Sequence, residues 1–405
     1  MQGSRVAVIG GSIAGCAATL AAVRAGAASV TVYERAGGEL RDRGVGISLH
    51  DDRYSELHEA GYVTPEMPYK QLDRRVWTVR DGDTGLGRGL ATQPFPFRAY
   101  NWGSLWQELR RRVPEGVDYR SRAAVAAVSQ DADGVTVRLA GGGEERHDAV
   151  VGADGYRSVV REAMFPHLSP LYAGYVGWRG AGTDAGGAWP DDGEARTVVF
   201  PGGHCVIYRI LTADGSSRVN WVLYTAPPEE LAKELNLDEP TSLPPGRLSS
   251  QLTTYLRQLV AEHFPPYWAE SILGTPPDST ILQPIYDLEV PGYAQGRLCL
   301  AGDAATVARP HIGGGSVKAL QDAAALESSW REATDWDAAM AAYDRGRTEI
   351  GTAMVAQARR LGRAQVEETP DWAGLDEEQF QGWWQEQNRT PDGRSGFGGH
   401  AMRRG

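Results

Sequence analysis

The chain of 405 residues contains little cysteine. Its three cysteines, Cys16, Cys205 and Cys299, lie far apart and lack the spacing of metal-binding motifs, so no metal site is expected. A small, odd number of cysteines is typical of a reducing compartment, which predicts a cytoplasmic location. Cys16 and Cys299 fall inside the glycine-rich motifs described below, where we expect them to be small, buried packing residues.

An excess of positive charge and long apolar runs are also missing. The 41 lysines and arginines are outnumbered by 52 aspartates and glutamates, which gives a net charge of −11. A surface that binds nucleic acid needs excess positive charge, so nucleic acid is not expected as the main partner. No uncharged run is long enough to span a bilayer, and the first predicted strand lies too close to Met1 to leave room for a signal peptide. We therefore expect an intracellular protein that does not bind membranes.

What the chain does contain is a glycine-rich motif near its start. A buried strand ends at Ile9 and breaks into Gly10-Gly11-Ser12-Ile13-Ala14-Gly15, which opens a helix. Such a turn presents backbone N–H groups and the positive end of a helix to a diphosphate. Ser12 stands where the usual motif has its second glycine, so its Cβ adds crowding while its hydroxyl offers a hydrogen bond. Glu34 ends the next strand, at the spacing typical of an acidic residue that bonds a ribose hydroxyl. For this motif alone, a strand–turn–helix without any ligand stays open.

Two later segments also place an aspartate after a predicted strand. Asp154 follows Val151-Gly152-Ala153 and precedes a helix, so its carboxylate is expected to cap that helix and to lie near the diphosphate. Asp303 follows Leu298–Gly302, and its carboxylate can accept hydrogen bonds from ribityl hydroxyls, which a flavin has and NAD lacks. The three motifs, in this order, predict bound FAD.

A third cluster of glycines, Gly313-Gly314-Gly315, precedes an alanine-rich helix. Three glycines before a helix leave N–H groups free, and a helix start aimed at a reduced flavin ring would stabilise its negative charge. Pro310 stiffens the entrance to this loop, which favours a binding role over a flexible loop.

The pattern of predicted elements divides the chain into a nucleotide-binding part and an insertion. We predict an α/β fold, with a Rossmann-like FAD-binding domain of the glutathione-reductase type, interrupted by a β-sheet-rich substrate domain and followed by C-terminal helices. The predicted FAD-binding domain comprises residues 1–68, 93–170 and 288–365, the substrate domain residues 69–92 and 171–287, and the C-terminal tail residues 366–405. A substrate would then lie at the junction of the two domains.

Over roughly residues 5–360, the chain resembles the single-component FAD-dependent aromatic monooxygenases of the para-hydroxybenzoate hydroxylase type. It is most similar to their 2,6-dihydroxypyridine 3-hydroxylase branch in Gly10-Gly11-Ser12, in Tyr172–Tyr175 with Trp178-Arg179-Gly180, and in Arg309-Pro310-His311 with Gly314-Gly315. The resemblance implies that NAD(P)H reduces FAD and that O2 then forms a flavin C4a-hydroperoxide. This species hydroxylates an electron-rich aromatic or heteroaromatic ring of the phenol or pyridine type. The resemblance also implies a homodimer.

The resemblance assigns residues to the cofactor. Glu34 would hold the adenosine ribose, Asp303 the ribityl chain, and Gly313–Gly315 the isoalloxazine edge. The full set of predicted FAD-binding residues is Gly10, Ser12, Ile13, Ala14, Gly15, Glu34, Arg35, Val128, Asp154, Gly302, Asp303, Pro310, Gly313, Gly314 and Gly315. Two positions depart from the family, since Trp102 replaces the usual arginine and Ser316-Val317 replaces an asparagine site. These departures predict that FAD is held more loosely or is lost on purification.

Hydroxylation of this kind works best on a phenolate-like ring, so a general base is expected near the substrate. The predicted catalytic residues are His50 and His311, because histidine is poised near neutral pH. A surface histidine explains His50 equally well. The predicted substrate-binding residues are Arg179, Tyr208, Trp221 and Tyr224. Arg179 would pair with an anionic substrate or the nicotinamide phosphates, although an internal salt bridge is an equal alternative, and strand aromatics are often ordinary core.

Two other functions stay open at this point. One is a flavin-dependent epoxidase or tailoring oxygenase that acts on a non-aromatic natural product. The other is a non-redox scaffold that keeps FAD as a structural ligand, for which Trp102 and Val317 would be signs of lost redox function. The leading hypothesis is a hydroxylase that uses FAD, NAD(P)H and O2 on a small aromatic substrate.

Overall fold

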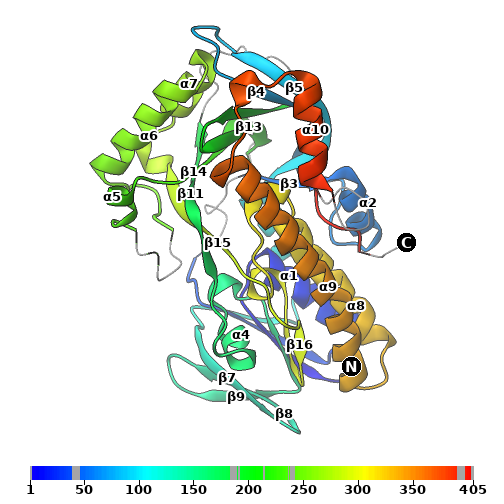
Figure 1. Ribbon diagram of the computed structural model, residues 1–405. Helices are drawn as coiled ribbons and strands as arrows, with labels where there is room; N and C mark the ends of the chain where they lie inside the picture. Colours follow the sequence, from blue (N-terminus) through cyan, green and yellow to red (C-terminus); the bar gives the residue numbers. More distant parts are fainter. Residues whose placement is uncertain are drawn as a thin grey trace.

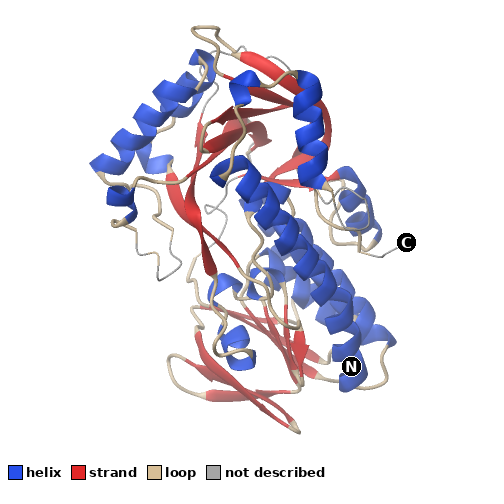
Figure 2. Cartoon of the chain, viewed as in Figure 1, coloured by secondary structure: helices blue, strands red, loops and turns tan. Residues whose placement is uncertain are grey.

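A computed structural model describes residues 2–38, 46–182, 189, 192–212, 215–235, 237, 242–389 and 397–402. Two large sheets lie at opposite ends of the molecule, and the long helices α8 (Gly315–Glu332) and α9 (Trp336–Gly362) run side by side between them (Figure 1). Figure 2 shows further helices on both sides of the sheet at the upper end of the view. Among the described residues, none of the helices combines the length and the apolar character that a membrane crossing requires.

The first sheet has six strands in the order β16-β17-β10-β1-β2-β6. Their bounds are β1 Arg5–Ile9, β2 Ser29–Glu34, β6 Asp118–Ser121, β10 Ala149–Gly152, β16 Ala294–Gln295 and β17 Leu298–Leu300. All of its strand pairs are parallel except β16 with β17. The carboxyl ends of the parallel strands therefore meet at one edge of the sheet, where all three sequence motifs follow. This arrangement confirms the predicted Rossmann-like α/β architecture.

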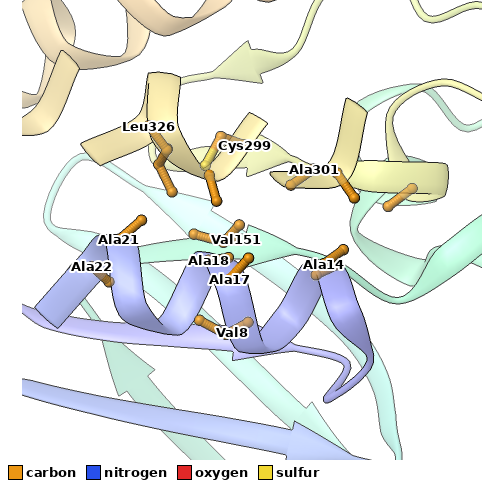
Figure 3. Packing of buried hydrophobic residues seen from close by; sticks show 14 of the residues in the cluster. Val8, Ala14, Ala17, Ala18, Ala21, Ala22, Val151, Cys299, Ala301 and Leu326 are labelled. Atoms are coloured by element: carbon orange, nitrogen blue, oxygen red, sulfur yellow. The ribbon is translucent and has the colours of Figure 1, made fainter. Parts of the chain in front are cut away.

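Helix α1 (Ile13–Arg24) lies between this sheet and α8. Its residues are buried from Ile13 to Ala22, because its alanines let both neighbours approach closely. Figure 3 shows these small side chains packed among Val8, Val151 and Leu326. Cys16 and Cys299 are buried free thiols in the same core, as the sequence predicts.

The second sheet has eight strands in the order β15-β11-β14-β13-β12-β4-β5-β3. Their bounds are β3 Gly46–His50, β4 Tyr69–Val79, β5 Arg88–Asn101, β11 Leu171–Gly182, β12 Glu194–Phe200, β13 Gly203–Leu211, β14 Ser217–Thr225 and β15 Ile281–Asp287. Helices α6 (Ser250–His263) and α7 (Pro266–Leu273) pack on one of its faces. The boundary predicted at residue 92 falls inside β5, and residues 46–50 join this sheet because β3 pairs with β5.

A third sheet of three strands comprises β7 (Val125–Asp131), β8 (Gly134–Leu139) and β9 (Glu144–His147). His147 ends β9, whereas residues 149–152 form β10 in the parallel sheet. The remaining helices are α2 Asp51–Glu59, α3 Trp102–Arg112, α4 Val159–Met164, α5 Glu229–Ala232 and α10 Glu377–Asn388.

The predicted C-terminal tail contributes to the core of the second sheet. Helix α10 lies against the sheet near β4 and β5 (Figure 1). Trp372 and Phe380 are almost fully buried and pack against Trp77 of β4, together with Trp383 and Trp384. The C-terminal segment therefore belongs to the folded body and closes one side of the sheet.

Candidate active site

A cavity of about 490 Å³ is lined by residues from both large sheets and from the loops that join them. Cavities of this size are typical of small-molecule and cofactor sites. It brings together most of the predicted site residues, which come from segments far apart in the sequence. These are Ser12, Ile13, Ala14, Arg179, Tyr208, Tyr224, Gly302, Asp303, Pro310, His311, Gly313, Gly314 and Gly315.

Two helices begin at this cavity without a side-chain cap. Ser12 precedes α1 and Gly314 precedes α8, and neither helix start receives a cap hydrogen bond from a described side chain. By contrast, α2, α3, α4, α6, α9 and α10 each have a side-chain cap. The short helices α5 and α7 also lack one, but they follow Pro228 and Pro265, which do not line the cavity. The first N–H groups of a helix need partners, and an anionic ligand supplies them. The arrangement fits a diphosphate at one helix start and an electron-rich ring edge at the other.

The glycines explain why the backbone can reach a ligand here. A Cβ on Gly10, whose φ is +101°, would collide with the carbonyl oxygen of Ala153, so the turn packs directly on the end of β10. Gly313 adopts a left-handed φ of +62°, which turns the chain from a 3₁₀ turn into α8. A Cβ on Gly315 would meet no atom within 4 Å, so this glycine leaves open space beside the helix start. These glycines therefore fit a cradle that holds FAD.

Glu34, Arg35 and Val128 do not line the cavity. The carboxylate of Glu34 accepts hydrogen bonds from Gly11 N–H and Ala36 N–H, both at 2.7 Å, and the residue is 8% exposed. Arg35 is exposed, whereas Val128 is buried in the core of the first domain. Glu34 therefore braces the glycine turn in this structure.

Asp154 lies beside the cavity, which is lined by its neighbours Ala153 and Gly155. Its Oδ2 accepts a hydrogen bond from Val159 N–H at 2.8 Å, the expected capping contact for α4. Its Oδ1 is buried and has no hydrogen-bond partner among the described residues. Burial raises the pKa of Asp154, so a ligand donor at Oδ1 would favour its charged form.

Asp303 lines the cavity, and its side chain is exposed there. Burial raises the pKa of this carboxyl group, and the positive charge of Lys318 opposes that shift. A carboxylate in this place can accept hydrogen bonds from the hydroxyls of a ligand.

A buried ionic network holds the peptide before Asp303, and the sequence analysis missed it. Lys318 Nζ donates to the Gly302 carbonyl at 2.9 Å and to Asp322 Oδ2 at 2.7 Å. Asp322 also accepts from Gly302 N–H at 2.8 Å and from Arg347 Nε at 2.6 Å. The side chains of Lys318, Asp322 and Arg347 are at most 2% exposed. The spacing of lysine and aspartate four residues apart in an alanine-rich helix is the signal that could have revealed this network.

Strand β14 sends alternate side chains to opposite faces of the sheet. Val222 and Tyr224 line the cavity, whereas Trp221 and Leu223 belong to the core beneath α6 and α7. Trp221 is fully buried, and its Nε1 donates to Thr275 Oγ1 at 2.9 Å. The structure thus places Trp221 behind the sheet, away from the predicted substrate pocket.

His311 lies in the cavity wall within a cluster of rings. Its Nε2 is 2.6 Å from the Tyr175 hydroxyl, and its ring centroid is 4.8 Å from that of Tyr224 and 5.1 Å from that of His204. Its Nδ1 is buried without a hydrogen-bond partner in the part of the chain that the structure describes. Burial lowers the pKa of His311 well below its usual value, so the imidazole is neutral at pH 7.

His50 is placed outside this cavity. It precedes α2, where its Nδ1 accepts a hydrogen bond from Asp52 N–H at 3.2 Å. Its ring meets Phe97 edge-on at 5.1 Å and lines a separate, smaller cavity. Phe97 and Phe397 line both cavities, so they stand between His50 and the other site residues. The capping contact explains this histidine without a catalytic role.

The cavity is also lined by residues outside the predicted site, among them Trp102, Phe397 and Arg75. Trp102, at the start of α3, lines the cavity beside the glycine turn. Phe397, from the C-terminal segment, closes another side and is anchored there by Gly398 N–H, which donates to the Ile312 carbonyl at 2.9 Å. Arg75 of β4 is buried in the wall, and its Nε donates to Thr197 Oγ1 at 2.6 Å. No local sequence pattern distinguishes Arg75 from Arg74, which lies on the other face of the strand.

Comparison with known proteins identifies an FAD-binding family and related monooxygenases. A family model described as an FAD-binding domain matches residues 257–375. The chain is 28% identical over 375 residues to a 2,6-dihydroxypyridine 3-monooxygenase of Paenarthrobacter nicotinovorans, covering 88% of this chain and 90% of that protein. It is 30% identical over 335 residues to a 3-amino-4-hydroxybenzoate 2-monooxygenase of Streptomyces platensis, covering 79% of this chain and 77% of that protein.

A solved structure shares the whole architecture. The 2,6-dihydroxypyridine-3-hydroxylase from Arthrobacter nicotinovorans superposes with a TM-score of 0.78 at 27% identity, covering 90% of this chain and 93% of that chain. Enzymes of this kind use FAD, with NAD(P)H as the typical cosubstrate, to hydroxylate aromatic rings. The similarity extends over more than three quarters of both chains. This chain belongs to the single-component FAD-dependent aromatic monooxygenases.

Proposed function

We propose that this monooxygenase hydroxylates a small ring that already carries a hydroxyl group, such as a hydroxypyridine or a phenol. The observation that supports this substrate class is the continuity of one cavity, from the uncapped starts of α1 and α8 to a cluster of tyrosine and histidine side chains. The two curated relatives described above are named for hydroxylated, electron-rich rings. FAD supplies the redox chemistry that activates O2 when it is bound.

Residues of this chain would hold that cofactor in three places. The N–H groups at the start of α1, from Ile13 to Gly15, would bind the diphosphate. Asp303 would accept hydrogen bonds from the ribityl hydroxyls, and Gly313–Gly315 would face the polar edge of the ring system. Glu34 would hold the adenosine ribose, and its carboxylate already bonds the glycine turn. Arg35, Val128 and Asp154 stay predictions as flanking residues.

We assign proton uptake from the ring hydroxyl to His311. The neutral imidazole protonated at Nε2 donates to the Tyr175 oxygen and leaves the Nδ1 lone pair free, which is the tautomer that a general base requires. Burial raises the pKa of Tyr175, so its hydroxyl stays protonated and does not compete for the proton. Because burial lowers the pKa of His311, the imidazole would accept this proton while the ring is attacked, and not hold it as an imidazolium beforehand.

Arg179, Tyr208 and Tyr224 would orient the ring. The Nε of Arg179 is buried without a hydrogen-bond partner, and no described carboxylate forms a salt bridge with this residue. Burial raises the pKa of both tyrosines, so their hydroxyls stay protonated and can donate hydrogen bonds to a substrate. A cation beside two hydroxyl donors is suited to a ring oxygen that gains negative charge.

The test is a panel of hydroxypyridines and phenols offered to the FAD-loaded enzyme with NADH or NADPH. We expect at least one member to accelerate NAD(P)H oxidation and to yield hydroxylated product in step with it. Oxidation that yields only hydrogen peroxide with every member contradicts the proposal. Turnover of non-aromatic alkenes alone would favour an epoxidase, and flavin that NAD(P)H does not reduce would favour a scaffold.

A pair of variants tests the assignment of the base. We expect His311→Gln to lower kcat by about 10²- to 10⁴-fold, the usual effect of losing a general base. His50→Gln is the matched control, because His50 lies outside the cavity, and its kcat should stay within a few-fold of wild type. Equal loss in both variants would overturn the assignment.

The resemblance also favours a homodimer in the cytoplasm. The buried free thiols of Cys16, Cys205 and Cys299 are compatible with a reducing compartment. Light scattering of the FAD-loaded protein measures the oligomeric state, and a mass of about 88 kDa, twice 43.8 kDa, is the expected result.

A further inference from the structure

A second cavity, of about 400 Å³, lies next to the active-site cavity, and the proposed function leaves it unused. This outer cavity is lined, among others, by Gln93, Phe95, Phe97, Gln381, Trp384 and Phe397. It lies between β5 and α10, which are side by side in Figure 1. Asp52 also lines it, and the side chain of this aspartate is 74% exposed, so the outer cavity reaches the protein surface.

Phenylalanine side chains separate the outer cavity from the active-site cavity. Phe95, Phe97 and Phe397 line both cavities, and their ring centroids lie 4.1 to 5.9 Å apart. Trp384 of α10 adds a ring whose centroid is 5.5 Å from that of Phe397. The outer cavity therefore offers aromatic faces and edges against which a flat aromatic ring can pack.

One polar group in the wall of the outer cavity has no partner. Gln93 is 9% exposed, and its Oε1 accepts a hydrogen bond from Trp77 Nε1 at 2.8 Å. An indole N–H can only donate, so this contact fixes the orientation of the amide and leaves Nε2 as its other end. This Nε2 is buried and has no hydrogen-bond partner within the described ranges. A buried donor without a partner is costly, so an acceptor atom of a ligand would complete the site.

The aromatic walls and the unpaired donor together select one kind of ligand, a flat ring that carries an acceptor oxygen. We propose that the outer cavity is a second binding site for a hydroxylated aromatic ring, whose oxygen accepts a hydrogen bond from Gln93 Nε2. The ring packs against Phe397 and Trp384. The inference rests on the proposed function for the choice of ring, because the active-site cavity takes the same class.

The two cavities then have different tasks. His311 lines the active-site cavity and not the outer one, so a ring in the outer cavity takes no part in the proton transfer. Occupation of the outer cavity changes how many rings the protein binds, and it adds no step to the chemistry.

The test uses 4-bromophenol, a hydroxylated ring that carries a heavy atom. Calorimetry with the FAD-loaded enzyme counts the molecules bound in solution, and the anomalous scattering of bromine locates them in crystals soaked with the same probe. We expect a bromine peak in the outer cavity and a matching site in solution. An outer cavity without bromine overturns the inference.

A pair of variants on α10 assigns the solution site to the outer cavity. Gln381→Trp fills the outer cavity, so we expect the number of bound 4-bromophenol molecules to fall by one per chain. Gln385→Trp is the matched control, because Gln385 is exposed, lies four residues further along α10 and does not line the outer cavity. Equal numbers of bound molecules in the two variants overturn the inference, even where soaked crystals show a bromine peak.

A third variant tests the hydrogen bond. Gln93→Met removes the donor and keeps the length of the side chain, and we expect the dissociation constant of the outer site to rise about 3- to 10-fold, the effect of one lost hydrogen bond. An unchanged constant contradicts the role of Gln93. If Gln93→Met does not fold, the α10 pair and the bromine peak still decide.

Failure of this inference and failure of the proposed function give different results. A protein that binds the second ring but hydroxylates no member of the panel keeps the outer site and overturns the proposed function. A protein that hydroxylates a ring while the outer cavity binds no 4-bromophenol keeps the proposed function and overturns the outer site.

Discussion

Replacement of Lys318 by methionine removes the ammonium group that joins the Gly302 carbonyl to the Asp322 carboxylate. Lys318 is 2% exposed and Asp322 is fully buried, so Arg347 is then the remaining cation of the carboxylate, beside the Gly302 N–H. Removal of one partner from a buried ion pair costs about 3–5 kcal/mol. We expect the lower end, about 3 kcal/mol, because the 2.6 Å contact with Arg347 remains.

The same variant should also bind FAD more weakly. Lys318 holds Gly302 from its carbonyl side, and Gly302 fixes the peptide that carries Asp303. Residues that orient a ligand-binding group typically change affinity by 10- to 100-fold when they are removed. We expect the FAD dissociation constant of Lys318→Met to rise about tenfold, equivalent to about 1.4 kcal/mol.

Denaturant unfolding of the protein without FAD, followed by tryptophan fluorescence, measures the first effect, and a flavin titration measures the second. The matched control is Lys233→Met, which removes a lysine that pairs with Glu229 at the same four-residue spacing. That pair is 72% and 85% exposed, so we expect a change below about 0.5 kcal/mol. A Lys318→Met protein that unfolds at the wild-type denaturant concentration would refute the structural role of the network.

Two further predictions concern pH and cavity shape. Below pH 6.5 the unfolded chain protonates His204, whereas the folded protein, where burial lowers the pKa of His204 to about 3, does not. Stability should therefore fall as the pH drops, by about 2 kcal/mol between pH 7 and pH 5, and His204→Gln should flatten this dependence in denaturant unfolding. Equal slopes in both proteins would contradict the pKa shift. Phe397→Ala should join the two cavities that the phenyl group separates and raise KM for a small aromatic substrate about tenfold. Phe397→Leu should raise this KM less. Equal KM values for both variants would show that Phe397 does not bound the site.

Much of the fold follows from signals that lie close together in the sequence. The strand–turn–helix around Gly10, the aspartates after β10 and β17, and the glycines before α8 are each read from a few consecutive residues. The rule that parallel strands end at one edge then brings them together. The domain boundary predicted at residue 92 lies inside β5. Prolines such as Pro94 and Pro96 argue against a strand, but β5 runs through both of them, next to a bulge in its pairing with β4.

The substrate end of the cavity depends on pairings that the sequence does not reveal. Arg75 reaches the cavity through the parallel register of β4 with β12, which sets it opposite Ala195. Trp221 lies in β14, a strand whose side chains are buried on both faces of the sheet. The alternation of apolar residues therefore does not predict which face meets the cavity, and a register shift of one residue would exchange the two faces. His50 has the chemistry of a general base, but it lies outside the cavity. Its ring nitrogen accepts a hydrogen bond from Asp52 N–H and caps α2.

The fate of oxygen tests most directly whether this cavity hydroxylates a ring. FAD-loaded enzyme is supplied with NAD(P)H, ¹⁸O₂ and the panel of hydroxypyridines and phenols, and the products are analysed by mass spectrometry. We predict one ¹⁸O atom in the hydroxylated product for each NAD(P)H consumed. Protein that binds FAD and consumes NAD(P)H but leaves every ring unlabelled would contradict the function assigned to this site.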